Sequence, residues 1–145
     1  MNSGTSAAFG RRVAALLYDG LLVGALLMVF TAAVLFLTHG NAVLRETVGA
    51  WVYLYRIGLV AVIAAYFVFN WTHSGQTLGM RAWRLHAVDV TGRRLKLGSA
   101  SLRFACAVLA WGPAALGVLW LYFDAEGLAL HDRLSKTRVI YLARS

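Results

Sequence analysis

The chain has 145 residues, of which 60% are apolar and 14% charged, and its mean hydropathy is +0.67. This composition is typical of a membrane protein and leaves room for a single domain, residues 1–145. Cys106 is the single cysteine, so an intramolecular disulfide is excluded and Cys106 is interpreted as a packing residue. The formal net charge is +8. No zinc finger, Gly-rich phosphate loop or aromatic-basic platform accompanies it, so we expect no nucleic-acid partner.

Three apolar stretches reach the roughly 20 residues that a membrane-crossing helix needs. They cover about residues 13–38, 49–70 and 102–123. The first exceeds the roughly 7 to 15 residues of a signal-peptide core, so we interpret it as an uncleaved anchor. The third contains Gly112 and Pro113, and a proline there either kinks a crossing helix or breaks it into a re-entrant segment. We therefore expect an all-α membrane protein with about three transmembrane or membrane-embedded helices.

The basic residues predict the orientation, because Lys and Arg near the ends of spans stay in the cytoplasm. Arg11 and Arg12 precede the first span, whereas the next loop holds only Arg45, offset by Glu46. The loop 71–101 is rich in basic residues: Arg81, Arg84, Arg93, Arg94 and Lys96. The amino terminus and this loop are thus expected in the cytoplasm of a bacterium, with the protein multi-pass in its inner membrane. Anionic lipid headgroups are the expected partner of the basic loop.

The tail, residues 124–145, is also basic, which favours the cytoplasm. A re-entrant third segment would return the tail to that side, whereas a kinked crossing would leave it outside. The loop 71–101 is expected to form either a short basic β-hairpin, with 83–90 and 94–97 flanking a turn at Thr91 and Gly92, or an irregular basic loop. Residues 137–142 are predicted to form a strand that adds to this hairpin if both lie on one side.

Asp19 is the most informative residue, because a carboxylate within a span costs about 2.5 to 3.5 kcal/mol. Arg12 projects to the same side of the helix but lies about 10 Å away along the axis, too far for a direct pair. We expect Arg12 to extend to the inner headgroups. Arg103, at the start of the third segment, is the first candidate donor to Asp19.

The second span carries Arg56, which is expected to extend toward the outer interface beside an aromatic belt of Trp51, Tyr53 and Tyr55. Small residues next to these charges predict close helix packing. These residues are Gly20 and Gly24 in the first span, and Gly58, Ala61 and Ala65 in the second.

In combination and in this order, several segments resemble the RDD family of small membrane proteins. They are Arg12 with Asp19, SGQTLGMR after the second span, VDVTGRRLKL in the basic loop, and LHDRLSKTRVI near the end. The resemblance covers about residues 9–142. It implies that Arg12, Asp19 and Asp132 are the arginine and two aspartates that give the family its name. From the residues alone, Asp132 is expected to accept hydrogen bonds at a turn or to pair with a nearby arginine.

Two functions follow as hypotheses. The first is an oligomeric transporter of an ion or small solute, in which Asp19 binds a cation or proton within a network of Arg12, Arg103, Arg56 and Asp132. Transport of some ligand is also what the family resemblance implies, and one protomer is too small to enclose a pathway. The alternative is a non-catalytic accessory or scaffold subunit of a larger membrane complex. We expect no enzyme, no metal and no cofactor, since the four histidines lie on different segments.

Overall fold

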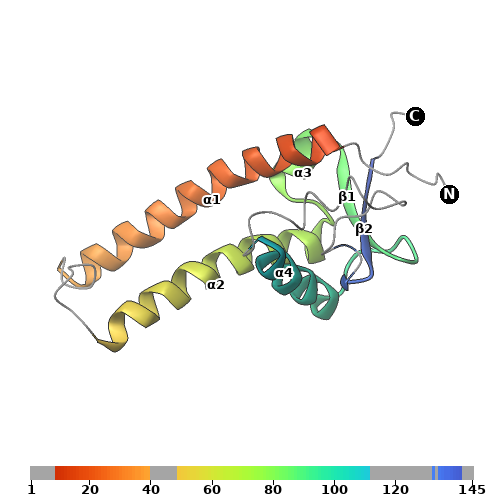
Figure 1. Ribbon diagram of the computed structural model, residues 1–145. Helices are drawn as coiled ribbons and strands as arrows, with labels where there is room; N and C mark the ends of the chain where they lie inside the picture. Colours follow the sequence, from red (N-terminus) through yellow and green to blue (C-terminus); the bar gives the residue numbers. More distant parts are fainter. Residues whose placement is uncertain (1–8, 40–48, 112–131, 133, 142–145) are drawn as a thin grey trace. The chain divides into compact units, whose positions relative to one another are not determined.

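The computed structural model describes residues 9–39, 49–111, 132 and 134–141. The chain is mostly helical, with one small sheet (Figure 1). In chain order its elements are α1 (Phe9–Leu37), α2 (Ala50–His73), α3 (Leu78–Ala82), β1 (Leu85–Asp89), α4 (Leu97–Trp111) and β2 (Thr137–Tyr141).

The helices α1 and α2 are long and apolar enough to cross a membrane. With 29 and 24 residues, they extend for about 43 and 36 Å at a rise of about 1.5 Å per residue, against a hydrocarbon core of about 30 Å. Large apolar side chains are exposed along both helices, as at Phe36 and Ile57. The two expected spans at 13–38 and 49–70 are therefore confirmed as long apolar helices, each extended by a few residues.

The chain forms two compact units, and the first consists of residues 20–66. Within it, α1 contacts α2 through aromatic and polar side chains. The rings of Phe30 and Tyr55 stack with centroids 6.2 Å apart, and the hydroxyls of Thr31 and Tyr55 lie 2.8 Å apart. A Cβ added to Gly58 would come within 2.6 Å of the Phe30 ring. The glycine thus lets the aromatic ring lie directly on the backbone of α2.

The second unit holds residues up to 19 and from 67 onward. Its sheet pairs β1 with β2 in antiparallel register, from Leu85 opposite Tyr141 to Asp89 opposite Thr137. Both strands are rich in β-branched or apolar residues, which suits a half-buried pleated surface. One face of the sheet joins a core of eight buried apolar residues: Ala15, Trp71, Met80, Leu85, Ala87, Leu95, Ala100 and Val139.

The turn after β1 explains why the expected hairpin is wrong in part. Asp89 accepts hydrogen bonds from the backbone N–H groups of Thr91 and Arg93, and Gly92 has a positive φ of 78°, so the chain does reverse here. The returning segment makes only one isolated bridge, between Val88 and Arg94, because α4 begins at Leu97. The full-length partner of β1 is β2, so the expected pairing of the tail strand with the loop is confirmed, and the all-α expectation needs this small sheet added.

The third apolar segment differs from its expected bounds. The helix α4 begins at Leu97, five residues before the predicted start at 102. Its exposed side chains include Leu102, Val108 and Leu109. The predicted continuation to residue 123, with the expected break or kink at Gly112 and Pro113, lies outside the described residues.

Candidate functional site

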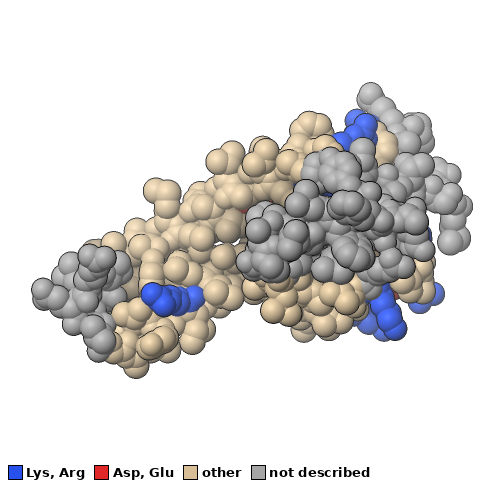
Figure 2. Space-filling model, viewed as in Figure 1, with Lys and Arg blue, Asp and Glu red and all other residues tan. Residues whose placement is uncertain are grey.

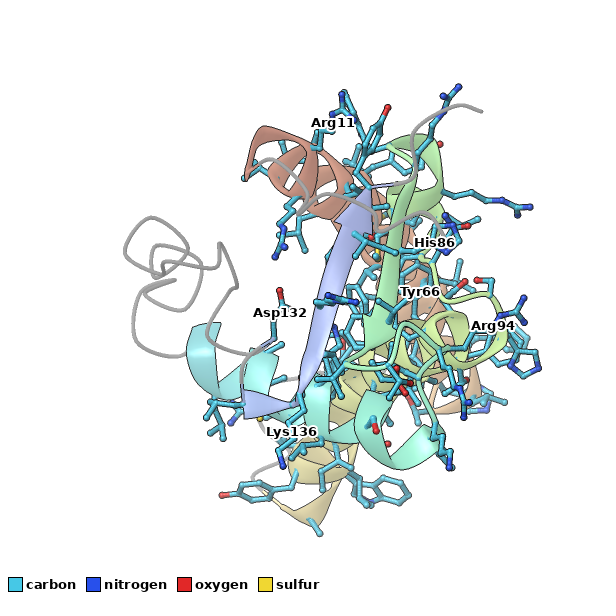
Figure 3. The ribbon with its side chains drawn as sticks, turned by 90° about the vertical axis from the view of Figure 1, so that its right-hand side faces the viewer. Arg11, Tyr66, His86, Arg94, Asp132 and Lys136 are labelled. Carbon is cyan, nitrogen blue, oxygen red and sulfur yellow. The ribbon has the colours of Figure 1, made fainter. Side chains whose placement is uncertain are left out.

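Two arginines from different helices converge on one buried aspartate, which lies five residues before β2 begins. Arg12, in the first turns of α1, places Nη1 2.7 Å from Oδ2 of Asp132, and Arg103 of α4 places Nη1 2.6 Å from Oδ1. The side chain of Asp132 is 0% exposed, and those of Arg12 and Arg103 are 10% and 4% exposed. Charge-assisted contacts of this length are among the stronger interactions in proteins. The cluster therefore ties both helices to the start of the tail strand, beside which Figure 3 shows Asp132.

Both arginines also reach β2 itself. Arg12 Nη2 donates to the carbonyl oxygen of Val139 at 3.3 Å, and Arg103 Nη1 donates to the hydroxyl of Thr137. The Ser135 hydroxyl lies 2.7 Å from that of Thr137 and extends the polar network. The Arg103 guanidinium also lies 5.0 Å from the ring centroid of Trp71, within cation–π range. The two guanidiniums and one carboxylate leave this cluster with a formal charge of +1.

Asp19 occupies a separate position two turns further along α1, and it is only 2% exposed. Its Oδ1 accepts the backbone N–H of Gly79 at 2.8 Å, and its Oδ2 accepts the hydroxyl of Thr77. That hydroxyl in turn accepts the N–H of Met80 at 3.1 Å, so Thr77 caps α3. Asp19 thus holds the amino-terminal end of α3 against α1, and its carboxylate has protein donors, although neither of the two is the expected Arg103.

Gly79 is required for this approach. A Cβ at Gly79 would overlap the carbonyl oxygen of Ala15 and would lie 2.8 Å from Cγ and 2.9 Å from Oδ2 of Asp19. Only a residue without a side chain lets the α3 backbone lie this close to α1.

Two expected contacts need correction. Arg103 pairs with Asp132 and not with Asp19, because α4 starts at Leu97 and presents Arg103 to the strand β2. Arg12 was expected to extend to the inner headgroups, but its guanidinium instead binds Asp132 and the carbonyl oxygen of Val139. The expectation that Asp132 pairs with an arginine agrees with the structure. Its partners Arg12 and Arg103 are far from it in sequence.

The remaining predicted residues lie outside this cluster. Arg56 is exposed on α2, in the other compact unit, and among the described residues it makes no ion pair. A Cβ at Gly20 or Gly24 would meet no described atom within 4 Å. Close packing at this Gly-x-x-x-Gly pattern is therefore not seen within the described part of the protomer. Ala61 and Ala65 are likewise exposed.

Hydroxyl and glycine residues are what the sequence analysis missed. Thr77 and Gly79 lie in the SGQTLGMR segment, and Ser135 and Thr137 lie in LHDRLSKTRVI. Both segments carry the family resemblance, but no role was predicted for these four residues. A threonine followed by a short apolar run is a helix-start signal that would have identified Thr77 as a cap. No local signal indicates that a carboxylate 58 residues earlier accepts its hydroxyl.

Titratable groups outside the cluster lie around the sheet. Burial, and then the positive charge of Arg94, lower the pKa of His86 on β1. The hydrogen bond from the Thr91 side chain, followed by that from the Arg93 backbone, lowers the pKa of Asp89. Within the described residues, no three His, Cys, Asp or Glu side chains gather in a way that would hold a metal ion.

Comparison with known proteins places the chain in a family. It is 35% identical over 82 residues to an uncharacterized protein of Rickettsia prowazekii (strain Madrid E), a match that covers 56% of this chain and 45% of that protein. The chain therefore matches less than half the length of this relative. No solved structure matches. The model of the RDD family matches residues 6–136, and the chain belongs to the RDD family.

Proposed function

We propose that this RDD-family protein is a non-catalytic accessory or scaffold subunit of a larger membrane protein complex. In this proposal α1 and α2 anchor the chain in the bilayer, and the family's charged residues hold a small sheet-bearing unit at their membrane boundary. The observation that carries the proposal is the closed ion-pair cluster, in which Asp132 is bound by both Arg12 and Arg103.

The closed cluster favours a structural role for these charges. Arg12 and Arg103 each already bind both Asp132 and β2, which leaves few donors of either guanidinium for a passing ligand. In this cluster of described residues, Nε of Arg103 is a buried donor with no hydrogen-bond partner. Removing one partner of a buried ion pair typically costs about 3 to 5 kcal/mol, because it leaves a buried charge uncompensated. Such a cluster makes the arrangement of α1, α4 and β2 specific, and a defined shape is what a docking surface requires.

The topology supports one common side for the sheet-bearing unit. The amino-terminal end of α1, the loop after α2 and the strand β2 all belong to one compact unit. If α1 and α2 both cross the bilayer, they return the chain to the side on which it started. By the positive-inside rule this side is the cytoplasm of a bacterial inner membrane, with anionic headgroups beside the basic loop. The third segment then enters the membrane without a net crossing.

The proposed side can be tested by labelling. A cysteine added after Ser145, in a Cys106→Ala background, is expected to react with an impermeant maleimide only after the cytoplasmic face is opened. Labelling of intact spheroplasts at this position, equal to that of a cysteine placed at residue 42 between the two long helices, would contradict the shared side.

The subunit role can be tested by isolation at native expression level in a mild detergent. We expect the full chain to co-purify with a stoichiometric companion or as a homo-oligomer. The Asp132→Asn variant is expected to lose the assembly, whereas Lys136→Gln, which changes an exposed residue, should retain it. A monodisperse monomer without any companion would contradict the proposal.

Transport of an ion or small solute is the second candidate, and a specific observation favours it. Asp19 is a buried carboxylate within a helix that is apolar enough to cross a membrane, and such residues commonly mark ion pathways. A cation would have to replace the hydrogen bonds from Thr77 and Gly79, and the pathway would need several protomers.

Flux in proteoliposomes separates the two candidates. If Asp19 binds the transported ion, Asp19→Asn should abolish flux, while Asp89→Asn, which alters an exposed turn, should leave it unchanged. Flux that survives in Asp19→Asn would reject the carboxylate as the ion site.

A further inference from the structure

A second group of basic residues lies at the opposite end of the sheet from the β1–α4 turn. Arg11 of α1 places its guanidinium carbon 3.9 Å from the ring centroid of Tyr141, the last residue of β2. Tyr141 pairs with Leu85 across the sheet, so Arg84 lies immediately beside it in the register. Arg11 and Arg84 are both near enough to the Tyr141 hydroxyl to lower its pKa. Figure 3 shows Arg11 at the end of α1, next to the ends of both strands.

The positive charges of this group are not balanced by the described carboxylates. Asp132 pairs with Arg12 and Arg103, Asp89 closes its own turn, and Asp19 binds α3. Arg11 and Arg84 instead face a neutral phenol oxygen. Their hydrogen bonds and charge lower the pKa of Tyr141, with Arg11 contributing most. Two guanidiniums that converge on one hydroxyl form a local concentration of positive potential.

The backbone holds Arg84 in an uncommon conformation. Its φ is 54°, in the left-handed region that few residues other than glycine adopt. The structure places this arginine, rather than a glycine, at the junction of α3 and β1. Backbone conformations of this kind cluster at functional sites, which directs attention to the side chain of Arg84.

We propose that Arg11, Arg84 and Tyr141 form a binding site for a phosphate monoester. Guanidinium forks donate in pairs to phosphate oxygens, and the hydroxyl proton of Tyr141 is a third donor beside them. This goes beyond a diffuse attraction of the basic loop to the membrane, because three named groups, from α1, the junction of α3 and β1, and β2, would bind one anion. It does not depend on a partner subunit.

The ligand has two sources with the same chemistry. Arg11 stands next to Gly10, where the apolar stretch of α1 begins, so the site lies where lipid headgroups are found if α1 crosses the bilayer. Phosphatidic acid carries a phosphate monoester at that level. Free inorganic phosphate is the soluble alternative. In Figure 2 most of the visible surface of the long helices is tan, and blue Lys and Arg atoms show both on the part that carries the sheet and at one place on the long helices.

The test uses the full chain in detergent, with native mass spectrometry of the lipids that each protomer retains. Wild type is expected to retain phosphatidic acid about tenfold more than phosphatidylcholine. The Arg11→Gln and Arg84→Gln variants should each lower that preference about tenfold, and Tyr141→Phe should lower it less, since only one donor is lost. The matched control is Arg138→Gln, which removes an exposed arginine from the same strand as Tyr141. This control should behave as wild type.

Each outcome decides the proposal. Loss of preference in Arg11→Gln and Arg84→Gln but not in Arg138→Gln supports the site. Competition by inorganic phosphate would identify the soluble source, and lack of competition the lipid. Equal loss in Arg138→Gln, or no loss in the two variants, would overturn the site in favour of diffuse surface charge. If the glutamine variants melt earlier than wild type, Arg11→Lys and Arg84→Lys serve in their place. The lysine variants keep the positive charge but lose the paired N–H donors of the guanidinium. An unchanged preference for phosphatidic acid in these variants would also overturn the site.

Discussion

Replacing Gly79 with alanine tests the contact between α3 and α1 most directly. The added Cβ would overlap the carbonyl oxygen of Ala15 and press on the Asp19 carboxylate at 2.8 to 2.9 Å. The backbone of α1 is held by its own helical hydrogen bonds and cannot give way locally. The segment 77–80 would therefore have to move away from α1.

The expected loss combines two costs. Overpacking of a close contact costs about 1 to 3 kcal/mol, and loss of a hydrogen bond to a charged group costs about 1.5 to 3 kcal/mol. Together they amount to roughly 2.5 to 6 kcal/mol in the free energy of unfolding. At roughly 2 to 4 °C per kcal/mol, the melting temperature should fall on the order of 10 °C.

The measurement is the fraction of monodisperse protein that survives heating in detergent, followed by size-exclusion chromatography. Gly98→Ala is the matched control, because a Cβ at Gly98 in the first turn of α4 meets no described atom within 4 Å. This control should be neutral or slightly stabilising, by up to about 1 kcal/mol. A melting temperature for Gly79→Ala equal to that of Gly98→Ala would show that Gly79 does not lie against α1.

Three further changes probe the same unit by the same heating assay. Asp132→Asn leaves Arg12 and Arg103 facing a neutral amide and should cost about 3 to 5 kcal/mol; a loss below that of Arg12→Gln alone would contradict the shared carboxylate. Thr77→Val removes both the cap of α3 and a donor to Asp19, and it should lower the free energy of unfolding by about 1 to 2 kcal/mol or more. Thr77→Ser keeps the hydroxyl and should have a stability near that of wild type. Equal losses of stability in both variants would argue against the hydroxyl contact. Because the pKa of His86 is lowered in the folded state from its usual 6.5, the unfolded chain binds more protons. Stability should thus fall as the pH drops through 6.5 toward the lower folded value, and His86→Gln should flatten that part of the curve; an identical pH dependence in the variant would contradict the assignment.

Hydrophobic length predicted α1 and α2 well, because a continuous apolar run of more than 20 residues has few alternatives to a long helix. The same signal misplaced the start of α4, since Leu97 to Ser101 mixes small and polar residues and reads as a loop when taken alone. Strand propensity identified both 85–89 and 137–141. It could not show that β1 pairs with the distant β2 and hardly at all with the nearby segment 94–97. Pairing between strands about 50 residues apart has no signal in the local sequence.

For the charged residues, the sequence likewise predicted some positions correctly but not all of their partners. Family resemblance marked Arg12, Asp19 and Asp132, and helical spacing correctly separated Arg12 from Asp19. The prediction that Arg103 is the partner of Asp19 is wrong, because it considered charged donors only and left out neutral ones. A threonine hydroxyl and a glycine N–H satisfy that carboxylate instead. Only the tertiary structure reveals which donors reach a buried acceptor.

The pairing of Arg12 with Asp132 joins positions 120 residues apart, and this has a consequence during synthesis. A ribosome adding about 5 to 20 residues per second needs roughly 6 to 24 seconds to cover that separation. Throughout this interval the leading helix is already available for insertion while its guanidinium still lacks the carboxylate. A nascent chain released before codon 132 would therefore contain the leading helix without the carboxylate that its guanidinium binds in the folded protein.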